Sequence, residues 1–252
     1  MDMTPTGPKI DSDWYKLSFG ELYPVIYAHR SVESAEPESR FAADQLNIGP
    51  HSRVLDLCCG NGRHLVHLRK YTDNIIGLDY SGDLLSIARD AVSAKLIRAD
   101  MRAIPMTNAM DAVVNFFTSF GYFEDEAENH AVVHGVSNAL KPNGRFMIDY
   151  VNPAFARETL VPNSEREQDG YTIQETRWIS ESSNRLNKST TLTKDGHICA
   201  ELGESVQLFT REDLTQLLES ERLMVDEVFG DTDGSGFDTA SERMIFIGTK
   251  RI

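Results

Sequence analysis

The stretch VLDLCCGNGRH, residues 54–64, decides the fold class of this chain. An apolar run that contains Asp56 breaks at Gly60 and Gly62, and a helical pattern resumes directly after them. Glycine has no Cβ atom, so it permits a tight turn and a close approach between the main chain and a ligand. We therefore expect a buried strand, a glycine turn and a helix whose first amides face a pocket.

Apolar strands and amphipathic helices alternate after this stretch. Strands are predicted at residues 53–58, 74–79, 95–99, 111–117 and 145–150, and a turn at residues 141–144 precedes the last of them. Helices are predicted from 62 to about 70, from Ser81 onward, and from about 124 to 140. Thr210 and Asp213 resemble a capping box at the start of a further helix, and strands at 223–229 and 243–249 follow it. Such near-continuous apolar strands are typical of a parallel α/β sheet that helices cover on both faces.

Residues 166–209 have a different pattern. Segments 170–180, 185–194 and 197–209 are rich in threonine and partly alternating, and Asp195-Gly196 is a hairpin turn signal between two of them. We expect an antiparallel sheet at 166–209, inserted into an α/β domain that comprises 49–165 and 210–252.

The N-terminal region precedes this domain. Apolar residues three and four apart predict that 13–47 is mostly helical, with Pro24 near a helix start or a break. Residues 1–12 are polar and contain proline and glycine, which favours a loose tail.

Composition limits the function classes. The formal net charge is −14, because 39 Asp and Glu outnumber 25 Lys and Arg. Nucleic-acid binding proteins concentrate basic residues, so the composition favours a small-molecule partner over a nucleic acid. No apolar run approaches the roughly 20 residues of a membrane span, and the start of the sequence lacks the pattern of a signal peptide. Three cysteines make no disulfide framework, which favours a cytoplasmic protein.

A dinucleotide site is the first alternative for the glycine turn. That site requires G-x-G-x-x-G, whereas Leu65 occupies the third glycine position here. Asp56 is also unfavourable beside a pyrophosphate, and it suits a ligand with a cationic amino group.

The run from Asp56 to His64 resembles the first signature of the class I S-adenosylmethionine (SAM)-dependent methyltransferases, and later signatures of that family follow in order. The resemblance implies a Rossmann-like α/β fold, in which a seven-stranded, mostly parallel sheet is flanked by helices and has an antiparallel last strand. It also implies S-adenosyl-L-methionine as the cofactor, with S-adenosyl-L-homocysteine (SAH) as its product.

The same resemblance assigns cofactor contacts. Asp79 matches the acid that binds the two ribose hydroxyls, and Asp100-Met101 matches the pair that binds adenine. Relatives use an N-terminal helical segment, here residues 1–48, as a lid, and Arg30 would then bind the methionine carboxylate. Alternatively, the tyrosines of this segment form an ordinary core face. The implied cofactor-binding residues are Tyr27, Arg30, Asp56, Cys58, Gly60, Gly62, Asp79, Tyr80, Asp100, Met101, Asn115 and Phe116.

Three residues are candidates for catalysis on the acceptor side. The run FTSFGYF, residues 117–123, resembles that of a bacterial branch of small-molecule methyltransferases, including sugar N-methyltransferases with an added antiparallel sheet. Ser119 and Tyr122 are expected to bond the acceptor, unless this loop only packs its aromatic side chains onto the sheet. Arg243 either pairs with a substrate carboxylate or anchors its own loop by bonding Asp238.

We expect no metal site. His64 and His67 are spaced for one helix face but have no evident third ligand. Asp149 and Asn152 only weakly match the magnesium ligands of relatives that act on catechols.

The sequence therefore predicts a SAM-dependent methyltransferase that acts on N or O of a small metabolite of natural-product or sugar-like type. The alternatives are a tRNA or protein methyltransferase and a SAM-binding protein without transferase activity. The identity of the acceptor and the oligomeric state, monomer or homodimer, stay open.

Overall fold

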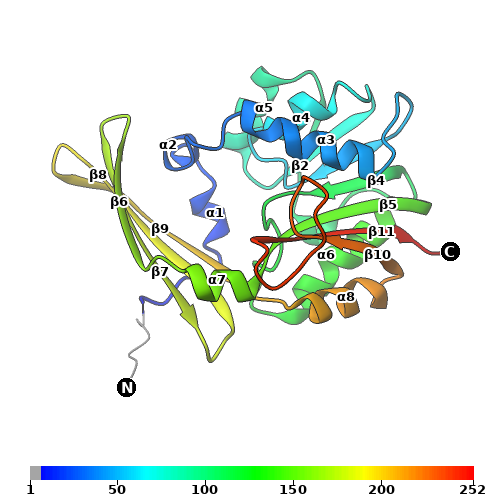
Figure 1. Cartoon of the computed structure of the whole chain (residues 1–252). Coiled ribbons are helices and arrows are strands. Elements are labelled where there is room, and N and C mark those ends of the chain that lie inside the picture. The colour runs from blue at the N-terminus through cyan, green and yellow to red at the C-terminus, as the bar shows by residue number, and fades with distance from the viewer. Residues whose placement is uncertain (1–6) are drawn as a thin grey trace.

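Two sheets form the framework of the protein, which a computed structural model describes over residues 7–252 (Figure 1). The larger sheet has seven strands in the order β10-β11-β5-β4-β1-β2-β3. Only β11 is antiparallel to its neighbours β10 and β5, which confirms the predicted fold class. Its strands are β1 (Val54–Leu57), β2 (Ile75–Asp79), β3 (Lys95–Arg98), β4 (Met110–Asn115), β5 (Leu140–Val151), β10 (Leu223–Phe229) and β11 (Arg243–Lys250).

Helices cover both faces of this sheet (Figure 1). On one face lie α3 (Glu36–Gln45), α4 (Arg63–Leu68) and α5 (Gly82–Ala91), and on the other lie α6 (Glu126–Ala139) and α8 (Arg211–Ser220). The two faces bury separate apolar clusters, with Leu65 in one and Val133 in the other. The predicted caps are present, since Ser81 accepts from Leu84 N and Thr210 forms a capping box with Asp213.

The register of the central strands brings the predicted site residues to one edge. Asp56 on β1 lies opposite Gly77 on β2 and Val114 on β4. Because these three strands are parallel, their carboxyl ends meet at the same edge, where a parallel sheet leaves a crevice for ligands.

A four-stranded antiparallel sheet lies beside the α/β part (Figure 1). Its strands follow chain order: β6 (Asn163–Gln168), β7 (Tyr171–Ser180), β8 (Arg185–Lys194) and β9 (His197–Gln207). Three of them match the predicted segments. β6 was not predicted, because its sequence NSEREQ has no apolar residue to show the alternation of a strand. The short helix α7 (Pro153–Thr159) was also missed, and it buries only Ala156.

The N-terminal region is less helical than predicted. Instead of one long helical stretch, it forms α1 (Tyr15–Ser18), α2 (Tyr23–Ile26), the 3-10 helix η1 (Glu33–Ala35) and α3. Pro24 lies in the first turn of α2, where main-chain nitrogens have no helical acceptor, so the missing N–H of proline costs no helical hydrogen bond. The predicted tail and lid begin before residue 7, and that part lies outside the described residues.

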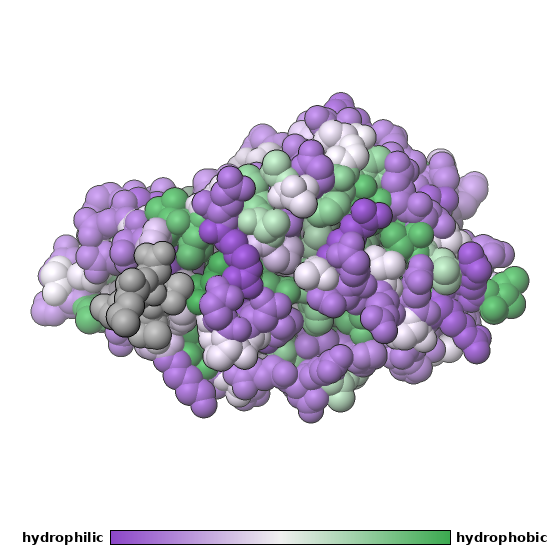
Figure 2. All heavy atoms as spheres, turned by 60° about the horizontal axis from the view of Figure 1, so that its bottom comes forward, coloured by the Kyte–Doolittle hydropathy of each residue, from purple (hydrophilic) through white to green (hydrophobic). Residues whose placement is uncertain are grey.

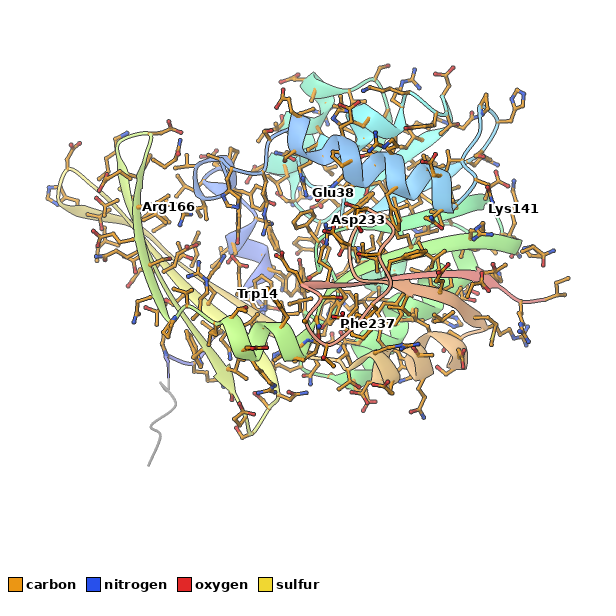
Figure 3. All side chains as sticks on the ribbon, viewed as in Figure 1. Trp14, Glu38, Lys141, Arg166, Asp233 and Phe237 are labelled. Carbon is orange, nitrogen blue, oxygen red and sulfur yellow. The ribbon has the colours of Figure 1, made fainter. Side chains whose placement is uncertain are left out.

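The short helices α1 and α2 join the two sheets. They lie between them, with Trp14 in the same region (Figures 1 and 3). Ile26 and Tyr27 pack on Ile173 and Leu192 of the smaller sheet, while Trp14 belongs to a core cluster of the larger one. The segment therefore bridges the two parts of the molecule.

The predicted turn at residues 141–144 is a bulge within β5. Met110 pairs with Leu140, but Ala112 already pairs with Arg145, so the intervening residues of β5 project out of register. Asn143 has φ +64°, which marks the local reversal.

The molecular surface is mostly polar on the face shown in Figure 2, where hydrophobic residues form small, scattered patches. Over residues 7–252, none of the helices combines the length and apolarity that crossing a bilayer requires.

Gly62 should be needed for packing as well as for its backbone angle. It is the N-cap of α4 with φ +81°, and an added Cβ would lie 3.0 Å from Ala88 Cβ on α5. We expect Gly62→Ala to lower the free energy of unfolding by about 2 kcal/mol in urea titrations. Gly196, with φ +77° and open space around it, is the control: Gly196→Ala should cost about 1 kcal/mol. Equal losses would contradict crowding at Gly62.

Candidate functional site

Two connected cavities open at the carboxyl edge of the larger sheet. The narrow cavity, of about 620 Å³, is bordered by the ends of β1 and β2 and by residues 99–101. The wide cavity, of about 1030 Å³, is bordered by the β4 loop, by α2 and by the smaller sheet. Both cavities touch Cys58, Gly60, Ser119 and Tyr122, so they form one continuous cleft.

Most of the predicted site residues border this cleft. Those on the narrow cavity are Cys58, Gly60, Asp79, Tyr80, Asp100, Met101, Ser119 and Tyr122. The wide cavity adds Tyr27, Arg30 and Phe116. Four predicted residues do not border either cavity: Asp56, Gly62, Asn115 and Arg243.

Asp79 fixes the shape of the glycine turn. Its carboxylate accepts hydrogen bonds from Gly60 N and Ser81 N, both at 2.8 Å. Burial raises the pKa of Asp79, and these amide bonds partly oppose that rise. Each carboxylate oxygen can accept more than one hydrogen bond, so Asp79 can still accept from hydroxyl groups in the narrow cavity.

The two glycines of the opening motif have different roles. Gly60, with φ +54°, borders both cavities, and an added Cβ would have no contact closer than 3.8 Å. Gly62 borders neither cavity, and an added Cβ there would face Ala88. Cys58 also has a left-handed backbone, with φ +62°, and burial raises its thiol pKa well above the usual value.

Asp56 and Asn115 lie buried near the cleft, and each has one oxygen without a partner among the described residues. Asn115 Nδ2 donates to Leu57 O at 2.9 Å, which ties β4 to β1. Burial, reinforced by the charge of Asp79, raises the pKa of Asp56 well above its usual range. Buried acceptors without donors are rare in proteins, but neither residue borders a cavity, so these oxygens do not line the cleft.

Asp100 is held by its neighbour Arg102. Its carboxylate accepts from Arg102 N at 2.9 Å and from Arg102 Nε at 3.0 Å. Burial alone would raise the pKa of Asp100, but the bonds to Arg102 outweigh it and lower the pKa. Arg102 also pairs with Glu128 and bonds the Tyr15 hydroxyl, so this wall of the narrow cavity is rigid.

The loop after β4 is clamped by Asp149 on β5. Phe117 and Thr118 both have positive φ, and their amides bond the Asp149 carboxylate and carbonyl at 2.8 Å. Guanidinium groups lie over the Phe117 ring, with Arg30 at 5.1 Å and Arg63 at 4.4 Å from its centre. Both arginines border the wide cavity, which therefore has positive charge on this side.

Arg243 has neither of the roles considered for it. Its guanidinium pairs with Asp149 and lies 3.4 Å from Glu38, and it does not border the cleft. Asp238 instead accepts from the amides of Ala240 and Ser241 in its own loop. Arg243 therefore supports the β4 loop through Asp149, which the sequence spacing did not indicate.

Glu38 joins this network to α4. It projects from α3 (Figure 3) and accepts from His64 Nε2 at 2.7 Å, with Arg63 at 3.3 Å. Burial lowers the pKa of His64 to about 4, so the ring is neutral at neutral pH and donates through Nε2–H. His67 bonds Val32 O, and no cluster of three metal-ligating side chains occurs within residues 7–252.

Arg185 on β8 was not recognised from the sequence. Its buried guanidinium donates to the carbonyl oxygens of Gly121, Tyr122 and Phe123 at 3.3, 2.7 and 3.0 Å. It thereby fixes the loop that carries Tyr122 against the smaller sheet. Nothing in the sequence around this single arginine of a threonine-rich strand indicates that it contacts the loop of Tyr122.

Comparison with known proteins agrees with this geometry. A family model described as a methyltransferase domain matches residues 54–144. A curated relative from Streptomyces venezuelae, dTDP-3-amino-3,4,6-trideoxy-alpha-D-glucopyranose N,N-dimethyltransferase, is 31% identical over 54% of this chain and 58% of its own length. The chain spans about three-fifths of the length of the curated relatives it matches first.

Solved structures share the fold over nearly the whole chain. A SAM-dependent methyltransferase from Clostridium acetobutylicum superposes with a TM-score of 0.76 at 16% identity, covering 92% of this chain and 96% of its own. The sugar N-methyltransferase KedS8 from Streptoalloteichus has a TM-score of 0.70 at 21% identity, covering 100% and 99%. The smaller sheet and the N-terminal segment are thus part of a known arrangement.

His64 should make stability depend on pH. Because its pKa is about 4 in the folded protein and 6.5 when unperturbed, the unfolded chain binds more protons between these values, and stability falls as pH drops through that window. The largest expected loss in the free energy of unfolding is about 3 kcal/mol. We expect His64→Gln to flatten the dependence in urea titrations from pH 7 to 4, while His51→Gln, at an exposed position, should not. An unchanged slope in His64→Gln would contradict this prediction.

Arg185→Met should loosen the loop of Tyr122. Three buried carbonyl groups would lose their donor, at a cost of about 3 kcal/mol in unfolding free energy. Amide hydrogen exchange at residues 119–123 should accelerate more than elsewhere in the chain. The matched control is Arg177→Met on β7, whose guanidinium bonds Glu175 and Ser164 instead. Equal exchange of this loop in both variants would argue against the contact.

Proposed function

Since this chain belongs to the class I SAM-dependent methyltransferases, we propose that it transfers a methyl group from SAM to a nitrogen or oxygen of a small, sugar-like molecule. The observation that carries this proposal is the convergence of Gly60, Asp79 and Asp100 on one narrow cavity at the ends of three neighbouring parallel strands.

The residues present fit the cofactor. Asp79 has free acceptor capacity for the ribose hydroxyls, and Asp100 with Met101 would hold the adenine. Asp56 lies buried and borders neither cavity, so it would favour the cofactor's positively charged amino group through its charge instead of by contact. Arg30, on the opposite side, would bind the carboxylate, because a guanidinium forms charge-assisted hydrogen bonds to it.

The chain's own contribution is to orient the acceptor and exclude water. The cofactor's sulfonium supplies the reactive methyl group. Ser119 and Tyr122 lie where the two cavities meet, and burial raises the phenol pKa of Tyr122 well above 10. Tyr122 is therefore a neutral hydrogen-bonding group, unsuited to deprotonating an alcohol.

A nitrogen acceptor fits these groups better than an oxygen acceptor. A neutral amine already has a lone pair and needs orientation, whereas an alcohol needs a base. His64 borders the wide cavity, but its Nε2 is engaged by Glu38. The N,N-dimethyltransferase activity named for the Streptomyces venezuelae relative supports the same preference.

The acidic surface and the free thiols support two further parts of the proposal. A net charge of −14 disfavours tRNA as the acceptor. Cys58, Cys59 and Cys199 are all free, as expected for a protein of the cytoplasm.

A thermal-shift experiment with SAM tests the cofactor site. At about 1 mM SAM the wild type should melt at a higher temperature, because a ligand that binds only the folded state stabilises it. Asp79→Asn removes the charge that strengthens the ribose bonds, so most of the shift should disappear. Asp83→Asn, at an exposed position on α5, should keep the full shift. A wild type that does not respond to SAM would refute the proposed function.

Methyl transfer separates the remaining alternatives. Incubation with labelled SAM and a panel of amino sugars, their nucleotide derivatives, bulk tRNA and cellular protein should label only the small molecules. Label in tRNA or protein would favour those acceptors, and SAM binding without any transfer would indicate a binding protein.

A further inference from the structure

The wide cavity has one acidic side chain on its walls within the described residues, Glu204 on β9. Leu186 and Val206, from the same sheet, also border this cavity. The cofactor assignments above do not use it.

Glu204 is held in place by two neighbours. Its Oε1 accepts from the Tyr27 hydroxyl of α2 and lies 2.7 Å from Lys188 Nζ on β8. The Tyr27 hydroxyl in turn accepts from Lys188 Nζ. A carboxylate fixed by two donors on one oxygen cannot rotate freely, so its other oxygen has a defined direction.

The second oxygen, Oε2, has no hydrogen-bond partner in the part of the chain that the structure describes. The side chain of Glu204 is 25% exposed and borders a cavity far larger than a single water molecule. An ionised carboxylate only accepts hydrogen bonds, so a ligand group placed here must be a donor, such as a hydroxyl or a protonated amine.

The cofactor does not supply that donor. Its ribose hydroxyls are assigned to Asp79 in the narrow cavity and its amino group to the side of Asp56, and its carboxylate would be repelled by Glu204. The part of the wide cavity that borders the smaller sheet is therefore available to the second substrate, the methyl acceptor. Ser119 and Tyr122 border the same cavity, so a molecule held there can reach the methyl group.

We propose that Glu204, oriented by Tyr27 and Lys188, binds the methyl acceptor through a hydroxyl or protonated amine that is not the methylated atom. This inference rests on the proposed function, because it assumes that the narrow cavity holds the cofactor. It makes the acceptor a small molecule with several polar donors, and it makes Glu204 a residue that determines acceptor specificity.

The test uses the full-length protein and one defined probe, dTDP-3-amino-3,4,6-trideoxy-alpha-D-glucopyranose, which combines an amine with a hydroxyl. SAH affinity is measured first by calorimetry, and probe affinity is then measured on the SAH-saturated protein. Glu204→Gln should weaken probe binding at least tenfold, which is about 1.4 kcal/mol. It should change SAH affinity much less than probe affinity, because Glu204 does not border the narrow cavity.

Glu201→Gln is the matched control, since Glu201 lies on the same strand, an odd number of residues away, and is exposed. It should bind the probe as the wild type does. Glu204→Asp, which keeps the charge, should restore part of the affinity. A role of Glu204 in stability alone would lower the melting temperature without changing probe affinity in the folded protein.

The outcomes separate the two proposals. A wild type that binds SAH but not the probe, or equal probe affinity in Glu204→Gln and the wild type, overturns the role of Glu204 and leaves the proposed function intact. A wild type without SAH affinity refutes the proposed function. In that case the same pair of proteins is compared with the probe alone, and loss of binding in Glu204→Gln still supports the site.

Discussion

The hydrogen bond from Gly60 N to the Asp79 carboxylate is the contact on which the cleft depends. It joins the turn after β1 to the end of β2, so the main chain at Gly60 is held open toward the narrow cavity. The same carboxylate accepts from Ser81 N and thereby positions the start of α5. Because Asp79 is buried, each of these bonds lies in a low-dielectric environment, where losing it is costly.

A second group of charges supports the other side of the cleft. Asp149 holds the strained backbone at Phe117 and Thr118, while Arg243 and Glu38 extend the contacts to α3 and α4. These charges are mostly buried and mutually paired, which is the condition under which buried ions are tolerated. The network explains why the β4 loop keeps positive φ angles at two non-glycine residues. It also keeps Arg63 beside the wide cavity.

Most strands of the larger sheet were predictable because they are largely apolar runs between turn signals. Asp79 and Asp100 were predictable as well, since the end of a parallel strand places a side chain at the ligand-binding edge. By contrast, β6 is a polar edge strand without alternation, and the N-terminal segment breaks into short helices whose ends depend on packing. Arg243, Arg185 and Glu204 owe their surroundings to residues from 16 to more than 200 positions away in the sequence. Spacing within a single stretch does not encode such partners.

The two sheets divide the cleft between two kinds of ligand group. The larger sheet supplies main-chain amides and carboxylates at fixed strand ends, which suits a cofactor of invariant shape. The smaller sheet supplies side chains from long strands, in which every second residue points to the same face, so β9 brings both Glu204 and Val206 to the cleft. Tyr27 contacts residues on two walls of the wide cavity. Its hydroxyl bonds Glu204, and the Arg30 guanidinium lies 4.2 Å from the centre of its ring. Tyr27 therefore connects the wall of the wide cavity near Glu204 to the wall near Arg30.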